Sequence, residues 1–144
     1  RAGVKFTIEW QDFNALLDNY YYGYELDPAE RKYHSFNLAT GFTEVYDPYY
    51  SYHSDFLGTW QNATQTNDSL LDFLMEKMRG LDPEDKETYA EYWLEYQVRW
   101  NELLPVLPIY SNEYFDIFNA RVSGLATTPT YGWARAVLDV TVAE

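Results

Sequence analysis

Two carboxylates stand out by their position in the chain. Glu44 and Asp47 lie in a stretch rich in rings, residues 41–60, that directly follows a predicted strand. Proteins that combine helices with a sheet place ligand-binding groups where strands end, so a carboxylate here is suited to contact a ligand. Paired carboxylates also serve glycoside hydrolases. The sequence therefore leaves open both a binding site and an acid–base pair at Glu44 and Asp47.

The histidines and the missing motifs argue against catalysis. His34 and His53 are far apart and lack the short spacing of a zinc motif, and we interpret His53 as a solvated loop histidine despite its neighbour Asp55. The chain has no cysteine, no phosphate-binding glycine loop, no dinucleotide-binding motif and no nucleophile elbow. We expect no enzymatic activity, no metal and no cofactor.

Aromatic residues are unusually frequent, with 15 Tyr, 8 Phe and 5 Trp. Those in residues 82–104 repeat at helical spacing, which predicts a core face. The rings in residues 42–52 have no such period: Phe42, Tyr46, Tyr49, Tyr50 and Tyr52. Rings with exposed faces stack on ligands, so a sugar-binding receptor or a carbohydrate-binding module that uses residues 42–52 is an alternative reading.

Length and charge limit the class of protein. With 144 residues, 47% of them apolar, the chain is expected to form one globular domain over residues 1–144. A net charge of −13 repels phosphate backbones, which argues against nucleic acid as a partner. No apolar run reaches the about 20 residues that a membrane helix requires.

The elements expected in the first half of the chain begin with a strand over residues 4–8, where apolar and polar side chains alternate. Asp12 is expected to cap a helix that stops at Gly23, and residues 34–42 alternate again as a second strand. Residues 41–60 are expected to form a long ordered loop, a kind of segment that is often functional.

Two helices and further strands are expected in the second half. Asn67 or Asp68 caps the first helix, which ends at Gly80 and buries five residues: Leu70, Leu71, Leu74, Met75 and Met78. The second helix is expected from Asp82, as its cap, to Pro105. Short strands are expected at 106–110, 114–118 and 134–142. Alternating helices and strands predict an α/β fold, a mixed sheet flanked by helices.

The order of these segments resembles one family of ABC-transporter components, the extracellular solute-binding proteins of family 5, which bind oligopeptides, dipeptides or nickel complexes. The similar stretches are NDSLLD at 67–72, DPEDK at 82–86, LPVLPIY at 104–110 and RVSGL at 121–125, with the Asp47–Pro48 pair upstream. The match extends over nearly the whole chain in the family's order.

The resemblance implies a non-catalytic receptor that captures peptides, or another small solute, by closing two lobes. This chain would be lobe II, the C-terminal lobe, of a periplasmic-binding-protein type II fold. Its partners would be a peptide ligand, the upstream lobe of the same protein and the permease subunits of the importer. Its location would be extracytoplasmic, either in a periplasm or on the cell surface as a lipoprotein of a Gram-positive organism.

The resemblance also points to a ligand loop. In peptide-binding members an acidic residue four positions before the loop proline meets the α-ammonium group of the peptide, and this position is Glu44. Family members usually carry Asp there. Gly41 stands where many relatives have Trp, so either Phe42 takes over that packing or the ligand differs. The expected ligand-binding residues are Gly41, Phe42, Thr43, Glu44, Tyr46 and Asp47.

Overall fold

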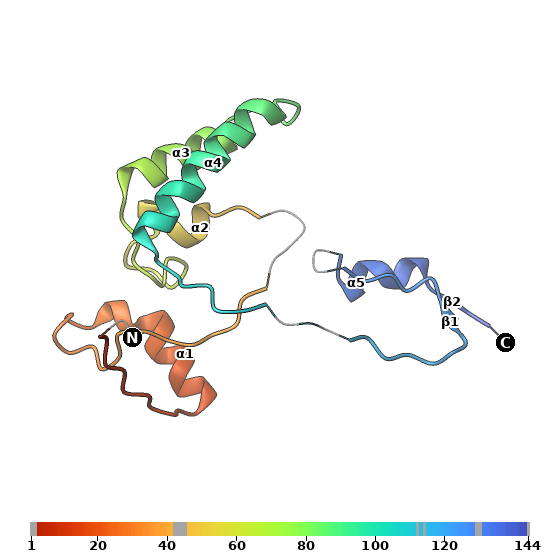
Figure 1. The fold of residues 1–144 in the computed structure, drawn as a ribbon, viewed down its shortest axis with the longest axis horizontal. Coiled ribbons are helices and arrows are strands. Elements are labelled where there is room, and N and C mark those ends of the chain that lie inside the picture. Colours follow the sequence, from red (N-terminus) through yellow and green to blue (C-terminus); the bar gives the residue numbers. More distant parts are fainter. Residues whose placement is uncertain (1–2, 42–45, 112, 114, 129–130, 144) are drawn as a thin grey trace. The chain divides into compact units, whose positions relative to one another are not determined.

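The structure, a computed structural model, describes residues 3–41, 46–111, 113, 115–128 and 131–143 (Figure 1). Contacts between residues divide the chain into two compact units. The first combines Arg1–Asn37 with Pro48–Val106, and the second combines Leu38–Asp47 with Leu107–Glu144. Each unit has its own packing, and the larger hydrophobic core belongs to the first.

The first helix of the first unit, α1 (Phe13–Tyr22), forms as the sequence predicts. The carboxylate of Asp12 accepts the backbone N–H of Asn14 at 3.0 Å, which satisfies a free donor of the first turn. The α-helix ends at Gly23, and a 3-10 turn over Gly23–Glu25 follows. The capping and stop residues expected for this helix are therefore confirmed.

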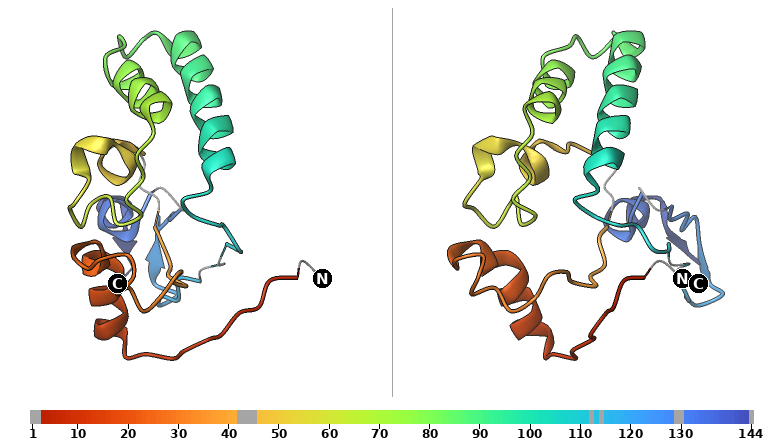
Figure 2. Two further views of the ribbon diagram at one scale, coloured as in Figure 1. Left: turned by 90° about the vertical axis from the view of Figure 1, so that its left-hand side faces the viewer. Right: turned by 60° about the vertical axis from the view of Figure 1, so that its left-hand side comes forward.

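A helical hairpin forms the centre of the first unit. Helix α3 (Ser69–Arg79) and helix α4 (Lys86–Leu103) lie side by side, joined by a short turn (Figure 2). The Asp68 side chain caps α3 by accepting the N–H of Leu71, and Gly80 follows its last residue. Both ends of α3 are as predicted.

The start of α4 differs from the prediction. Asp82 accepts the N–H of Glu84 in a separate turn, and Asp85 is the residue that caps the helix, by accepting the N–H of Thr88 at 3.1 Å. Two aspartates here compete for the same kind of bond to the backbone, and the later one begins the helix. At the other end Leu104, in the left-handed conformation, ends α4 just before Pro105.

Apolar side chains of three helices form the core. Its buried members are Tyr52, Leu71, Leu74, Met75, Met78 and Tyr96, and four partly buried rings pack against them, Tyr49, Tyr92, Trp93 and Trp100. Four rings of the predicted stripe on α4 are thus used for packing, whereas Tyr89 and Leu103, expected on the same face, are exposed. Leu70 was expected inside, but it is exposed on the outer side of the first turn of α3.

Residues 46–60 do not form the loop without secondary structure that the sequence predicts. A single helical turn, α2 (Tyr49–Tyr52), follows Pro48, whose carbonyl accepts the N–H groups of Ser51 and Tyr52. A 3-10 turn over Ser54–Phe56 comes next. One turn is too short to show a helical period in the sequence, which explains why the prediction was wrong here.

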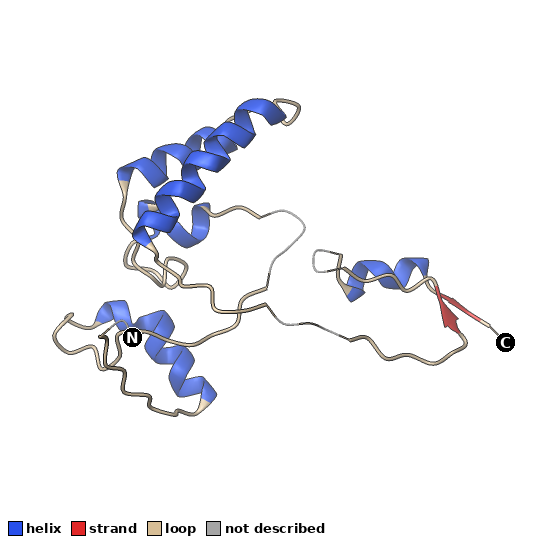
Figure 3. Ribbon diagram, in the orientation of Figure 1, coloured by secondary structure: helices blue, strands red, loops and turns tan. Residues whose placement is uncertain are grey.

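The second unit contains a small antiparallel ladder, shown in red in Figure 3. Strand β1 (Val122–Ser123) pairs with β2 (Thr141–Val142), so that Val122 lies opposite Val142. Helix α5 (Trp133–Ala136) and a 3-10 turn (Val137–Asp139) lie between these strands in sequence. A side chain at Gly124, where φ is +82°, would collide with the Asp139 carbonyl, so the close approach requires glycine.

The other predicted strands do not form. Among the described residues no strand occurs at 4–8, 34–41, 106–110 or 115–118, and only the last two residues of the expected strand 134–142 are in a ladder. The described residues of these segments have no strand partner, and an unpaired strand is not stable by itself. The larger mixed sheet flanked by helices stays a prediction.

Candidate functional site

Three of the expected ligand-binding residues, Phe42, Thr43 and Glu44, lie outside the described residues. The other three, Gly41, Tyr46 and Asp47, are exposed and belong to the second unit. A Cβ atom added at Gly41 would have no atom within 4 Å, so the chain is open to solvent at this position. The described part of the expected ligand loop is therefore accessible.

The segment that follows the ligand loop is firmly held in the first unit. Pro48 is buried at the start of α2, and Tyr52 at its end is part of the core. The intervening Tyr50 faces outward. One helical turn thus places two tyrosines of the ring-rich stretch on opposite sides, one for packing and one for solvent.

His53 is buried, contrary to the expectation of a solvated loop histidine. Only 3% of its surface is exposed. Its ring stacks on Tyr49 with a distance of 4.1 Å between centroids, and the Arg79 guanidinium lies 4.1 Å from the centroid of the same tyrosine. The imidazole is therefore a core group, held by contacts from α2 and α3 that the sequence does not reveal.

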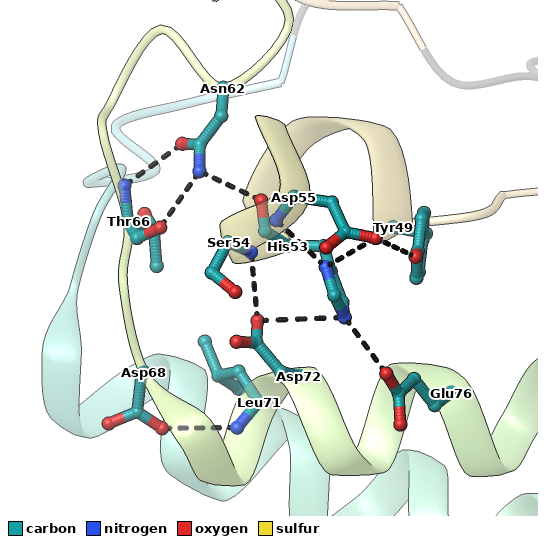
Figure 4. Close-up of polar contacts among 10 residues, drawn as sticks. All are labelled: Tyr49, His53, Ser54, Asp55, Asn62, Thr66, Asp68, Leu71, Asp72 and Glu76. Atoms are coloured by element: carbon teal, nitrogen blue, oxygen red, sulfur yellow. Dashed lines mark hydrogen bonds and ion pairs between the residues drawn. The ribbon is translucent and has the colours of Figure 1, made fainter. Parts of the chain in front are cut away.

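The two ring nitrogens of His53 have different surroundings (Figure 4). Nδ1 accepts the backbone N–H of Asp55 at 3.1 Å, so the neutral ring carries its hydrogen on Nε2. Nε2 faces two carboxylates of α3, at 3.5 Å from Glu76 Oε1 and 4.0 Å from Asp72 Oδ1. Both distances exceed a normal hydrogen bond, so Nε2 lies near the two carboxylates without a hydrogen bond to either.

Asp55 and Asp72 are themselves held by hydrogen bonds. The Tyr49 hydroxyl donates to Asp55 Oδ2 at 2.6 Å, and the backbone N–H of Ser54 donates to Asp72 Oδ1 at 3.0 Å. The bond to Asp55, together with loss of water contact, raises the pKa of Tyr49. This tyrosine therefore keeps its proton and acts as a donor.

The Asn62 side chain joins the end of α2 to the following turns. It is fully buried, and its amide donates to the His53 carbonyl at 3.2 Å and to the Thr66 carbonyl at 2.8 Å. Its own oxygen accepts the N–H of Thr66 at 2.9 Å, as Figure 4 shows. Every polar atom of this amide group thus fixes a piece of backbone, which is the way to bury an asparagine without penalty.

The polar cluster formed by Tyr49, His53, Asp55, Asn62 and Asp72 is suited to hold α2 and the turns after it in place. His53 is closed to solvent, so its nitrogens cannot exchange protons with a bound substrate. Within the described part of the chain, no group of three histidine or acidic side chains could hold a metal ion. None of the described helices is long and apolar enough to cross a membrane.

Next to the cluster is a shallow pocket that sequence reasoning missed. It has a volume of about 400 Å³ and is lined by Tyr50, Ser51, Trp60 and Gln61. Trp60 is the last aromatic residue of the ring-rich stretch 41–60. That it lines the same pocket as Tyr50 depends on the turns between them, which the sequence does not reveal.

Comparison with known proteins adds no further assignment: no family model, no curated protein and no solved structure matches this chain.

Proposed function

We propose that this chain is one lobe of a solute-binding receptor that captures peptides for an ABC importer outside the cytoplasmic membrane and performs no chemistry on them. The proposal starts from the ordered series of motifs that resemble family 5 solute-binding proteins. It also takes account of an exposed ligand loop, since Tyr46 and Asp47, the described neighbours of Glu44, are open to solvent.

The observation that carries the proposal is a set of segments without regular secondary structure in which apolar residues alternate in sequence and are exposed. The apolar residues of 4–8 are exposed, as are the polar residues between them, with Ile8 at 79%. The same pattern recurs at Leu107 and Ile109, and at Phe115 and Ile117, where the exposed fraction reaches 96%. Rows of this kind are typical of strands that lie on a core, and soluble proteins rarely leave large apolar patches uncovered.

In a two-lobed receptor these exposed apolar segments would be covered. Segments that alternate in this way would pair with strands from the upstream part of the receptor, and the covered faces would become the sheet core of the lobe. The helical hairpin of α3 and α4 would be one of the helical elements that flank this sheet. The lobe would then present the loop with Glu44 toward the cleft.

Binding in that cleft would depend on charge. A carboxylate that is shielded from water by lobe closure binds a terminal ammonium group strongly, because charge-assisted hydrogen bonds gain strength when water is excluded. Glu44 would supply this carboxylate. Closure of the opposing lobe would supply the remaining contacts, so the 144-residue chain alone should bind peptides weakly or not at all.

Calorimetry tests the proposal. The full-length receptor is titrated with a pool of peptides that differ in length and sequence, and heat of binding is expected for part of the pool. Absence of binding across the whole pool contradicts peptide capture. Turnover of a glycoside or an ester by the same protein would contradict the non-catalytic role and would favour Glu44 and Asp47 as an acid–base pair.

One observation favours the sugar-binding alternative. Of the rings in the stretch 42–52, Tyr46 and Tyr50 are exposed, while Tyr52 is buried in the core. Stacking on a sugar requires an exposed ring, so Tyr46 and Tyr50 are the described rings that could contribute. A carbohydrate receptor of the same lobe architecture would bind glycans and not peptides in the calorimetric experiment.

A further inference from the structure

The pocket between Tyr50 and Trp60 lies within the first unit, apart from the expected ligand loop. Its lining consists of two adjacent residues of α2, Tyr50 and Ser51, and two residues of a later turn, Trp60 and Gln61. The two rings remain largely open to solvent, with 51% of Tyr50 and 54% of Trp60 exposed. The pocket is shallow and open to solvent, with a volume of about 400 Å³.

Both rings are held in place by other rings. Trp60 meets Tyr21 of α1 edge to face, with 6.1 Å between centroids and 81° between planes. Tyr50 contacts Phe56 at 5.2 Å and Tyr49 at 5.9 Å. Neither ring therefore depends on a ligand to fix its orientation, and little side-chain freedom would be lost on binding.

The backbone under the pocket is held as well. Asn62, which follows Gln61, is tied to the carbonyl of His53 at the end of α2. Gln65 donates to the carbonyls of Asn62 and Thr59 and accepts the N–H of Gly58 at 2.9 Å. These bonds close the turns on both sides of Trp60, so the distance between the two walls is set before any ligand arrives.

The lining of the pocket is itself uncharged. No charged side chain belongs to the lining, and the Arg79 guanidinium lies near it, 5.4 Å from the centroid of the Tyr50 ring. Two ring faces favour a flat apolar surface, and the Ser51 hydroxyl and the Gln61 amide offer both donors and acceptors. A pyranose combines apolar C–H faces with hydroxyl groups at its edge, and a hydrophobic side chain of a peptide lacks those hydroxyls.

We propose that the Tyr50–Trp60 pocket binds a neutral pyranose ring, which lies against the indole of Trp60 and the phenol of Tyr50 and exchanges hydrogen bonds with Ser51 and Gln61. The proposal is independent of peptide capture, because all four residues belong to the first unit and none belongs to the expected ligand loop. Either site can be absent without affecting the other.

Fluorine NMR of the intact protein labelled with fluorotryptophan tests the site, and Trp60→Phe assigns the signal of Trp60. Maltotriose and cellotriose, titrated to about 10 mM, are expected to shift that signal with saturation at millimolar affinity. Trp60→Ala is expected to weaken sugar binding, measured by calorimetry, by at least about tenfold. Trp133→Ala is the matched control, because Trp133 has a similar exposed fraction, 59%, in the second unit.

Each other outcome contradicts the proposal. No shift of the Trp60 signal with either sugar means that the pocket is not a pyranose site. A shift with glycyl-phenylalanine amide but not with the sugars identifies it as a pocket for peptide side chains. Equal loss in Trp60→Ala and Trp133→Ala points to a general effect. Gln61→Ala, which leaves both rings in place, must also weaken sugar binding if the amide contributes hydrogen bonds.

Discussion

Arg99 of α4 holds Asp68, the residue that caps α3. Its Nη2 lies 2.6 Å from Asp68 Oδ2, while Asp68 Oδ1 accepts the backbone N–H of Leu71 at 3.0 Å. Because the two side chains are only partly exposed, at 32% and 14%, the pair is shielded from water more than a surface ion pair is. One carboxylate therefore fixes both the start of α3 and its contact with α4.

Replacing Arg99 by Met should destabilise the hairpin. The substitution removes the charge-assisted bonds to Asp68 and the bond to the exposed Glu102 and keeps most of the apolar stem, so the free energy of unfolding should fall. Urea denaturation followed by circular dichroism measures the change. Arg121→Met, on an exposed residue, is the control and should have almost no effect. Equal loss in both variants would show that the pair does not stabilise the hairpin.

Acid should weaken the same contact. The hydrogen bonds from Arg99 lower the pKa of Asp68 below its ordinary value, with a further contribution from the N–H of Leu71. The unfolded chain therefore binds this proton more readily, so the stabilisation is complete near neutral pH and is lost as the pH falls below about 5. Urea midpoints measured across this range should fall less steeply for Asp68→Asn than for the wild type. Identical slopes would contradict the assignment.

The two histidines should behave differently on truncation. His53→Ala removes a buried ring that stacks on Tyr49 and leaves the N–H of Asp55 without its acceptor, so a loss of about 2–4 kcal/mol is expected. His34 is exposed, and His34→Ala should change the free energy of unfolding by less than about 0.5 kcal/mol. Thermal and urea unfolding of the two variants provide the comparison. Similar values for both would place His53 in solvent.

Asn62 should be essential for the turns around Trp60. Asn62→Ala leaves the carbonyl and the N–H of Thr66 without these partners and removes one of the two hydrogen bonds to the His53 carbonyl, so about 2–4 kcal/mol of stability should be lost. Amide hydrogen exchange should become faster at Thr66 in particular. Asn67→Ala, on an exposed neighbour, is the control and should leave exchange at Thr66 unchanged. Unchanged exchange in Asn62→Ala would contradict the role given to this amide.

The helices of this chain could be predicted because their signals are local. Asp12 and Asp68 cap helices with their own side chains, and Gly23 and Gly80 stand where the helices end. The apolar period of α3 identified its buried face apart from Leu70. Asp85, and not Asp82, begins α4, since the sequence alone does not decide which of two nearby aspartates caps the helix.

The strands and the candidate site could not be predicted in the same way. Apolar residues such as Phe6 and Ile8 alternate with polar ones, which indicates a strand with one apolar face. Strand formation, however, depends on a partner strand that the segment itself does not specify. The burial of His53 depends on Tyr49 and on α3, and the pocket at Trp60 depends on the Asn62 hydrogen bonds. Such contacts between separate segments leave no period in the sequence.

The most direct measurement compares Glu44→Gln with the wild type in calorimetric titrations of the proposed receptor. It uses one peptide with a free amino terminus and the N-acetylated form of the same peptide. Loss of the carboxylate charge should weaken binding of the free-amine peptide by about 1.5–3 kcal/mol and affect the acetylated form much less. Glu91→Gln, with the same loss of charge on an exposed residue of α4, should leave both affinities unchanged. Equal weakening of the two peptides by Glu44→Gln would contradict recognition of the amino terminus.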